Sequence, residues 1–416
     1  MSYTVFARKY RPQTFEALAG QEHVARTLSN AIESNRVAHA FLFTGVRGVG
    51  KTTAARILAK ALCCERGPTP TPCNECDRCR DITAGVDVDV QEIDGASNNG
   101  VDDVRRLQET LPFAPARGKL KIVIVDEVHM LSTGAFNAFL KTLEEPPAHV
   151  KFIFATTEVH KVPVTIRSRC QRYDFRLIPQ PVIAERVREI LAVEAVDADD
   201  EAIDIVSAEA AGSMRDALTL LDQLVALAGE RLVGSEVVRA LGIASRGALR
   251  GLLAATLEGD AAAVLEAVRA LYDQGADIRH LTAQLLSYAR DLVVLRVTGD
   301  ESALVDLVPE ERRAAAELAA QVDAPELQRT FAMLSKLADE VTVSASPDIV
   351  LEMGLVRLAS RPRLREVSAL IADLEALRAQ LGGDGPTGGG PSRGGSPPRG
   401  ERRRDGGRPS PAAPSR

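Results

Sequence analysis

The feature that most constrains the fold is a segment that matches the phosphate-binding loop pattern GxxxxGK[ST] at every fixed position. It reads Gly45-Val46-Arg47-Gly48-Val49-Gly50-Lys51-Thr52, and Thr53 follows it. The glycines let the backbone curl, so that consecutive N–H groups converge on phosphate oxygens. Lys51 adds a positive charge, and the Thr52 hydroxyl completes the ligand shell of a Mg²⁺ ion. The segment therefore predicts a site for a nucleoside triphosphate, contacted by residues 45–53.

The sequence around this loop predicts an α/β fold. Apolar runs at 40–44, 121–125 and 151–157 have the length and the nearly continuous hydrophobicity of strands that are covered on both faces. Helical patterns lie between these runs, for example at 52–62, directly after the loop, and at 133–145. Strands that alternate with helices predict a parallel sheet with helices on both faces.

Strand signals stop after position 179, and the following segments have the periodicity of helices. We expect four parts: a nucleotide-binding domain at 1–179 with a cysteine-rich insertion at about 63–80, a helical domain at 180–243, a second helical domain at 244–380, and a disordered tail at 381–416. Residues 382–416 hold eleven Gly and seven Pro. Such a composition cannot bury enough apolar surface to fold.

Two acidic residues end the apolar run at 121–125. Asp126 is expected near the Mg²⁺ ion, and Glu127 is expected to orient or polarise a water molecule. By itself, an Asp-Glu pair at a strand end is more often a solvated turn. Some 75 residues after a phosphate loop, on a neighbouring strand, the pair favours hydrolysis of ATP or GTP instead.

Five of the six cysteines are crowded between positions 63 and 79. The spacing Cys64-x8-Cys73-x2-Cys76-x2-Cys79 predicts four thiolates around a structural Zn²⁺ ion. Two alternatives stay open. The C-x2-C-x2-C part of this spacing also occurs in iron–sulfur proteins, and Cys63 is able to replace Cys64 as the fourth ligand. Because the chain begins without the apolar core of a signal peptide, metal binding is favoured over disulfide bonds.

Two arginines are candidates for stabilising the charge on a departing phosphoryl group. Arg169 follows the third apolar run, and Arg215 lies in the first helical domain. Most arginines are surface or ion-paired residues. The need for a cation at the γ-phosphoryl group, commonly met by an arginine of another domain or subunit, favours a function for these two.

The charge balance limits contact with nucleic acid to a local surface. The chain carries a net charge of −6, while the tail from residue 382 onward has seven Arg against three acids. An acidic body is poorly suited to wrapping DNA over its whole surface. No run approaches 18 consecutive apolar residues, so we expect a cytoplasmic protein that does not bind membranes.

Several segments together resemble the gamma/tau family of bacterial DNA polymerase III, the ATPase of the sliding-clamp loader. Besides the phosphate loop and the cysteine insertion, these are residues 7–12, Phe15, 20–23, 92–97, 126–132, 136–147, 168–170 and Arg215. The likeness covers about 240 residues strongly and weakens after about 245. The cysteine insertion inside such an ATPase module makes the resemblance specific to this family.

The resemblance implies an AAA+ module (sheet domain plus helical lid) followed by an all-α collar domain that holds a pentameric ring together. Residues Ala7 to Tyr10 would lie near the adenine, and Thr157 would sense the γ-phosphate. Arg169 would be the arginine finger that completes a neighbouring subunit's site, while Arg215 would be the sensor of the lid. The cofactors would be ATP, Mg²⁺ and Zn²⁺.

The implied function is clamp loading within the DNA polymerase III holoenzyme, without being the polymerising subunit. ATP binding would order the ring of clamp-loader subunits around the sliding clamp and the primer–template DNA, and hydrolysis would release the closed clamp. Two alternatives stay open: a branch-migration type of DNA motor, and a non-hydrolytic scaffold subunit of the same assembly. The scaffold is disfavoured because Lys51, Thr52, Asp126 and Glu127 are all present.

The residues that would contact DNA are less well indicated. Basic candidates are Arg105, Arg106, Arg117, Lys119 and Lys121. A solvated face explains them equally well. The long form of the family continues with domains for the helicase and the polymerase, so both a short form and a truncated long form fit this sequence.

Overall fold

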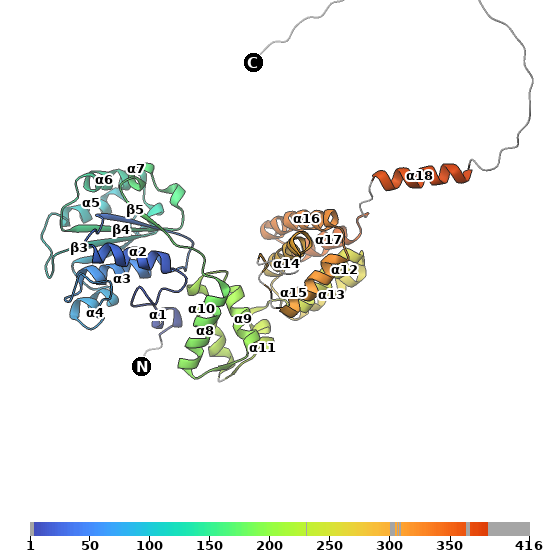
Figure 1. Ribbon diagram of the computed structural model, residues 1–416, viewed down its shortest axis with the longest axis horizontal. Coiled ribbons are helices and arrows are strands. Elements are labelled where there is room, and N and C mark those ends of the chain that lie inside the picture. The colour runs from blue at the N-terminus through green and yellow to red at the C-terminus, as the bar shows by residue number, and fades with distance from the viewer. Residues whose placement is uncertain are drawn as a thin grey trace, which may run out of the picture. The chain divides into compact units, whose positions relative to one another are not determined.

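The computed structural model describes residues 4–229, 231–299, 304, 305, 307, 309–362 and 367–381. The first part of the chain is built on one sheet of five parallel strands (Figure 1). In spatial order these are β2 (Val90–Asp94), β3 (Lys121–Asp126), β4 (Val150–Thr156), β1 (Ala40–Thr44) and β5 (Gln171–Asp174). The predicted parallel α/β fold is confirmed.

The three central strands are the three that the sequence predicts. Every residue of β1 is buried, as are most of β3 and β4, because neighbouring strands and helices surround them. The edge strands β2 and β5 are absent from the prediction. Each pairs with one neighbour and keeps partly exposed side chains, so their sequences lack a continuous apolar run.

Helices cover both faces of the sheet, and residues on β1 alternate between the two cores. Phe41 and Phe43 face the core beneath α2 (Glu22–Glu33) and α3 (Lys51–Cys63). Ala40 and Leu42 face the opposite core, against α5 (Val101–Thr110) and α6 (Thr133–Glu144). Figure 1 shows the two pairs of helices on opposite sides of the strands. Ser132 caps α6 by accepting a hydrogen bond from the N–H of Ala135, and thereby fixes its start.

The next segment has its own apolar core. Its elements are α8 (Gln180–Glu194), β6 (Asp197–Ala198), α9 (Asp200–Glu209), α10 (Met214–Ala228), β7 (Arg231–Leu232) and α11 (Gly234–Leu241). The parallel pair β6 and β7 differs from the all-helical expectation. Asp199 explains the pairing, because its carboxylate caps α9 through the N–H of Ala202 and also accepts the N–H of Gly234, after β7.

A further helical segment packs around another core of its own. It contains α12 (Arg246–Glu258), α13 (Ala261–Asp273), α14 (Ile278–Thr298), α15 (Pro309–Ala320), α16 (Ala324–Val343) and α17 (Pro347–Ala359). The helix α18 (Val367–Leu381) belongs to a separate unit that begins at Pro362. Of the predicted disordered tail at 381–416, Leu381 is the last residue of α18 and the remainder lies outside the described residues. Within the described part of the chain, every helix is too short or too polar to cross a bilayer.

Candidate functional site

The predicted phosphate loop lies between β1 and α3, as its pattern requires. Gly45, Gly48 and Gly50 all have positive φ angles, of 149°, 82° and 103°, which side-chain-bearing residues rarely adopt. At Gly48 there is also no room for a side chain, because a Cβ atom there would lie 1.8 Å from Oγ of Ser213, the N-cap residue of α10. The loop is therefore held against the segment that carries Arg215.

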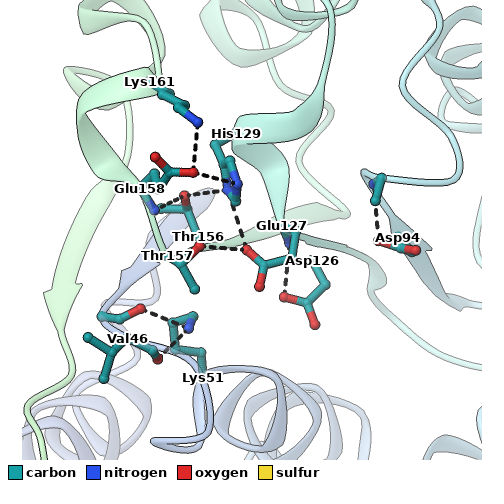
Figure 2. A network of polar contacts seen from close by, with 12 residues as sticks. Val46, Lys51, Asp94, Asp126, Glu127, His129, Thr156, Thr157, Glu158 and Lys161 are labelled. Carbon is teal, nitrogen blue, oxygen red and sulfur yellow. Dashed lines mark hydrogen bonds and ion pairs between the residues drawn. The ribbon is translucent and has the colours of Figure 1, made fainter. Parts of the chain in front are cut away.

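Lys51 points back into the loop that it follows. Its Nζ donates hydrogen bonds of 2.8 Å to the carbonyl oxygens of both Gly45 and Val46 (Figure 2). The side chain is buried, and burial lowers the pKa of Lys51, an effect that the nearby carboxylates of Glu127 and Asp126 oppose. A buried ammonium group held by neutral carbonyls is well suited to receive an anionic ligand.

The two predicted acids face the start of α3. The Thr52 hydroxyl donates a 2.6 Å hydrogen bond to Asp126 Oδ2, and Asp126 Oδ1 accepts the N–H of Glu127 at 2.9 Å. Oxygen ligands of this kind, one hydroxyl and one carboxylate, suit a Mg²⁺ ion. Asp94 is the register partner of Asp126 on β2. Figure 2 shows it apart from the network, where it accepts hydrogen bonds within its own turn.

Glu127 is held by residues from two neighbouring elements. Its backbone has a left-handed φ of 45°, and its Oε2 accepts a 3.2 Å hydrogen bond from the Thr157 hydroxyl. His129 Nδ1 lies 3.3 Å from the same Oε2 and 3.1 Å from Thr156 Oγ1, and its Nε2 lies 3.3 Å from Glu158 Oε1. This network fixes where the Glu127 carboxylate points.

The sequence interpretation assigns no role to three members of this network, namely His129, Thr156 and Glu158. His129 stands within the quoted run 126–132, two positions after Glu127, which is the only signal that the sequence offers for it. The other two follow from the pairing of β3 and β4, which brings the two strand ends together.

A cleft of about 1270 Å³ lies over the phosphate loop. Most of the predicted site residues line it: Ala7, Tyr10, Arg47, Gly48, Val49, Gly50, Lys51, Thr52, Thr53, Asp126, Glu127 and Arg215. Gly45 and Val46 are not among the described residues that line the cleft, although their carbonyls accept hydrogen bonds from Lys51, which does line it. Thr157 and Arg169 are likewise not among the described residues that line the cleft. Thr157 nevertheless donates a hydrogen bond to Glu127, which does line it.

The N-terminal segment closes one side of the cleft. Tyr10 follows the short helix α1 (Phe6–Lys9), and its hydroxyl donates to Glu194 at the end of α8. Lys9 Nζ donates to the same carboxylate at 2.6 Å, and the Phe6 N–H donates to Asp222 Oδ1 at 3.1 Å. These contacts fix the segment that carries Ala7 and Tyr10 against the wall of the cleft, and their place beside an adenine stays a prediction.

Arg215 and Arg169 differ in position. Arg215 lines the cleft, and its backbone N–H donates to the Gly48 carbonyl at 3.4 Å. Arg169 lies between α7 (Val164–Arg167) and β5, where its guanidinium donates to the Thr165 carbonyl at 2.7 Å and to Glu144 at 2.6 Å. Arg169 is thus outside the cleft of its own chain.

Sequence reasoning missed several cations that line the cleft, among them Arg56 and Arg11. Arg56 on α3 makes a bidentate pair with Glu92 of β2, at 2.7 and 2.8 Å. Arg11 stands beside Tyr10, and burial lowers the pKa of its guanidinium. Both residues add positive charge to a cleft that is already built for an anion.

Four cysteines come together beside α3 and α4 (Asp77–Ala84). The Sγ atoms of Cys64, Cys73, Cys76 and Cys79 all lie within 4.8 Å of one another. The Cys64–Cys73 and Cys73–Cys79 sulfur distances are 3.5 and 4.0 Å. Tetrahedral Zn²⁺ with Zn–S bonds of about 2.3 Å requires sulfurs about 3.8 Å apart, so the four thiols fit this ion.

Two details of the insertion bear on the ligand set. Backbone N–H groups point at the sulfurs, since Cys76 N donates to Cys73 Sγ and Cys79 N donates to Cys76 Sγ, both at 3.4 Å. Such donors stabilise thiolates. Cys63 stands outside the cluster and packs in the apolar core beneath the sheet.

The basic residues proposed for DNA contact are mostly engaged within the chain. Arg105 and Arg106 pair with Asp102 and Asp103 on their own helix, and Arg117 pairs with Asp81. Lys121 is wrong as a candidate: it is buried at the start of β3, and its Nζ donates to the Thr110 carbonyl at 2.7 Å. Lys119 is exposed.

Three family models match successive parts of the chain. The model described as DNA polymerase III, delta subunit, matches residues 20–179. The model for the DNA polymerase III clamp loader subunit, ATPase lid domain, matches residues 182–230. The model for DNA polymerase III subunits gamma and tau domain III matches residues 232–374.

Curated relatives match most of the chain. DNA polymerase III subunit tau of Bacillus subtilis is 40% identical over 386 residues, which are 92% of this chain and 68% of that protein. Subunit tau of Escherichia coli is 40% identical over 370 residues, 88% of this chain and 56% of that protein. Subunit gamma/tau of Mycobacterium tuberculosis is 38% identical over 379 residues, 90% of this chain and 66% of that protein. The chain thus spans 56% to 68% of the length of these relatives.

Proposed function

The chain belongs to the gamma/tau family of bacterial DNA polymerase III clamp-loader subunits, and we propose that it binds and hydrolyses ATP to load the sliding clamp onto primed DNA. Its fold is the AAA+ arrangement expected for this family, a parallel sheet covered by helices and followed by helical domains. The observation that carries the proposal is the meeting of Lys51, Thr52, Asp126 and Glu127 in one cleft.

Each of these residues has a proposed part in the reaction. Lys51 binds the β- and γ-phosphate oxygens of ATP, together with the N–H groups of the loop. Thr52 and Asp126 hold Mg²⁺, which when bound offsets the negative charge of the phosphates. Glu127 accepts a proton from, or orients, the attacking water, and Thr157 keeps its carboxylate in place. Ala7 and Tyr10 flank the adenine.

The assembly and the partners belong to the same proposal. The chain works in the bacterial cytoplasm as one subunit of a pentameric ring that grips the sliding clamp and the primer–template DNA. Arg169 reaches the ATP of a neighbouring subunit, and Arg215 acts within its own chain from the lid. The domain boundaries at 179/180 and 243/244 stay a prediction. The apolar cluster that begins at Ala244 supports the second boundary, whereas the cluster of the preceding helices also contains Phe6 and Ile178.

The proposed function is tested by the ATPase rate of the reconstituted clamp loader. We expect the sliding clamp and primed DNA together to stimulate turnover more than either one alone, because hydrolysis is coupled to clamp closure on DNA. If DNA stimulates turnover to the same extent with and without the clamp, a branch-migration type of motor would be favoured. An absence of turnover in every assembly would favour a non-hydrolytic scaffold.

The cysteine cluster is proposed as a structural Zn²⁺ site, with Cys64, Cys73, Cys76 and Cys79 as the ligands. Elemental analysis of the purified chain should give one zinc per chain, because a closed four-sulfur site leaves no open position and holds the ion tightly. Cys64→Ser should lose the metal, while Cys63→Ser, its matched control, should retain it. Iron with visible absorbance would show an iron–sulfur cluster, and metal loss on Cys63→Ser would reverse the ligand assignment.

A further inference from the structure

Lys60 is a buried cation that none of the proposed roles uses. It lies on α3, the helix that begins at the phosphate loop, and only 1% of it is exposed. Its Nζ donates to three uncharged oxygens: the Gln13 carbonyl at 3.0 Å, Gln13 Oε1 at 2.7 Å and Asn74 Oδ1 at 2.6 Å. An ammonium group in such surroundings is costly unless all its donors are satisfied, so these three contacts fix the segments that provide them.

One of these segments belongs to the cysteine loop. Asn74 stands between Cys73 and Cys76, two members of the four-sulfur cluster, and has a left-handed φ of 57°. Asn74 also lines the cleft, as do Arg80 and Thr83 of α4. The cysteine insertion is therefore a wall of the nucleotide cleft as well as a metal site.

The other segment is the N-terminal wall of the cleft. Gln13 Nε2 donates to the Arg11 carbonyl at 2.9 Å, and Gln13 Oε1 also accepts the Thr83 hydroxyl at 3.4 Å. Arg11 adjoins Tyr10, and both line the cleft. A continuous chain of hydrogen bonds thus runs from Asn74 through Lys60 and Gln13 to the backbone beside Tyr10.

We propose that Lys60 is a positioning residue that couples metal binding at the four cysteines to nucleotide binding in the cleft. Metal binding restricts the loop that carries Asn74, and this loop, through Lys60, holds Gln13 and the wall beside the adenine. When the metal leaves, the loop gains conformational freedom, Lys60 loses a partner, and the wall is no longer fixed. The inference rests on the proposed nucleotide site and adds a role for the insertion in it.

The first test is the substitution Lys60→Met in the full chain, which keeps the length of the side chain but removes its donors. The control is Lys151→Met, since Lys151 is a half-buried lysine away from the cysteine loop and its Nζ donates to one carbonyl, that of Val37, at 3.2 Å. Affinity is measured with a fluorescent ATP analogue, and zinc by elemental analysis. We expect Lys60→Met to bind the analogue about tenfold more weakly while retaining its zinc, and the control to match the wild type.

The second test removes the metal with a chelator. In the wild type, metal removal should weaken analogue binding about tenfold. In Lys60→Met it should weaken binding less than about twofold, because this variant has already lost the coupling. Asn74→Gly, which keeps the left-handed backbone, should behave like Lys60→Met, and the double variant should bind no more weakly than Lys60→Met alone. Asn74→Gly decides the question if Lys60→Met fails to fold.

Two outcomes would overturn the inference. One is that Lys60→Met binds the analogue as tightly as the wild type, and the other is that metal removal weakens analogue binding equally in both. Both outcomes leave the proposed function standing, because the wild type still binds the analogue. A wild-type chain with zinc that binds no analogue would instead refute the nucleotide site itself.

Discussion

Lys51→Ala will abolish ATP hydrolysis, with turnover falling by at least about 10²- to 10³-fold, the effect typical of removing one preorganised donor from a charged transition state. The Lys51 ammonium group is the cation at the centre of the phosphate loop, where it already holds the carbonyls of Gly45 and Val46. Alanine leaves the triphosphate without this charge in a site where burial excludes much of the water. The measurement is single-turnover hydrolysis at saturating ATP, together with the dissociation constant of a fluorescent analogue.

Glu127→Gln is the control that separates binding from chemistry. It keeps the shape of the side chain and its contact with Thr157, and should therefore bind ATP normally while turning it over poorly. Thermal unfolding of each variant checks that the fold is intact. Turnover of Lys51→Ala within tenfold of the wild type would show that the loop does not bind the transferred phosphoryl group.

Local patterns predict the parts of this structure that local forces determine. The phosphate loop needs glycines with positive φ and a neighbouring strand and helix, and all these signals lie within some 25 residues of sequence. The central strands are recognisable because burial on both faces requires continuous apolar runs. The edge strands β2 and β5 escape the same reasoning, since one exposed side allows Glu92 or Arg172 into a strand.

Contacts between distant segments could not be predicted from the sequence. His129, Thr156 and Glu158 meet only because β3 and β4 end side by side, and a histidine shortly after a strand gives no sign of this by itself. For Lys60 the sequence suggests the opposite of what the structure shows: a lysine on a helix is normally expected in solvent, but Lys60 is buried. Lys121 is wrongly expected at the surface for the same reason. It is the first residue of the buried strand β3, and its ammonium group donates to a backbone carbonyl.

The proposed action of Arg169 on a neighbouring subunit agrees with its position in this chain. Arg169 is outside the cleft, in an ion pair with Glu144 at 2.6 Å, and the two side chains are 33% and 52% exposed. A pair so exposed contributes at most about 1 kcal/mol, so exchanging Glu144 for the γ-phosphoryl group of a neighbouring subunit costs little. A surface position with a weak partner is what an arginine that acts on another subunit needs.

Arg169→Ala should therefore leave ATP binding nearly normal but lower the turnover of the assembled ring by about 10³-fold or more, as for other arginines supplied by a partner. Arg172→Ala is the matched control, because Arg172 is another exposed arginine nearby, and it pairs with Asp174 at 2.7 Å. This control should hydrolyse ATP like the wild type. Weak ATP binding together with failure to assemble would show a structural role for Arg169 instead.

Mixed assemblies test directly whether Arg169 acts between subunits. Rings of Lys51→Ala chains alone and of Arg169→Ala chains alone should both be inactive, since every site lacks one of the two cations. In an equal mixture, some Arg169→Ala chains, with an intact Lys51, stand beside Lys51→Ala chains, which still carry Arg169. Turnover should reappear at those interfaces. If Arg169 served its own chain, no site in the mixture would hold both cations, and the mixture would stay as inactive as its components.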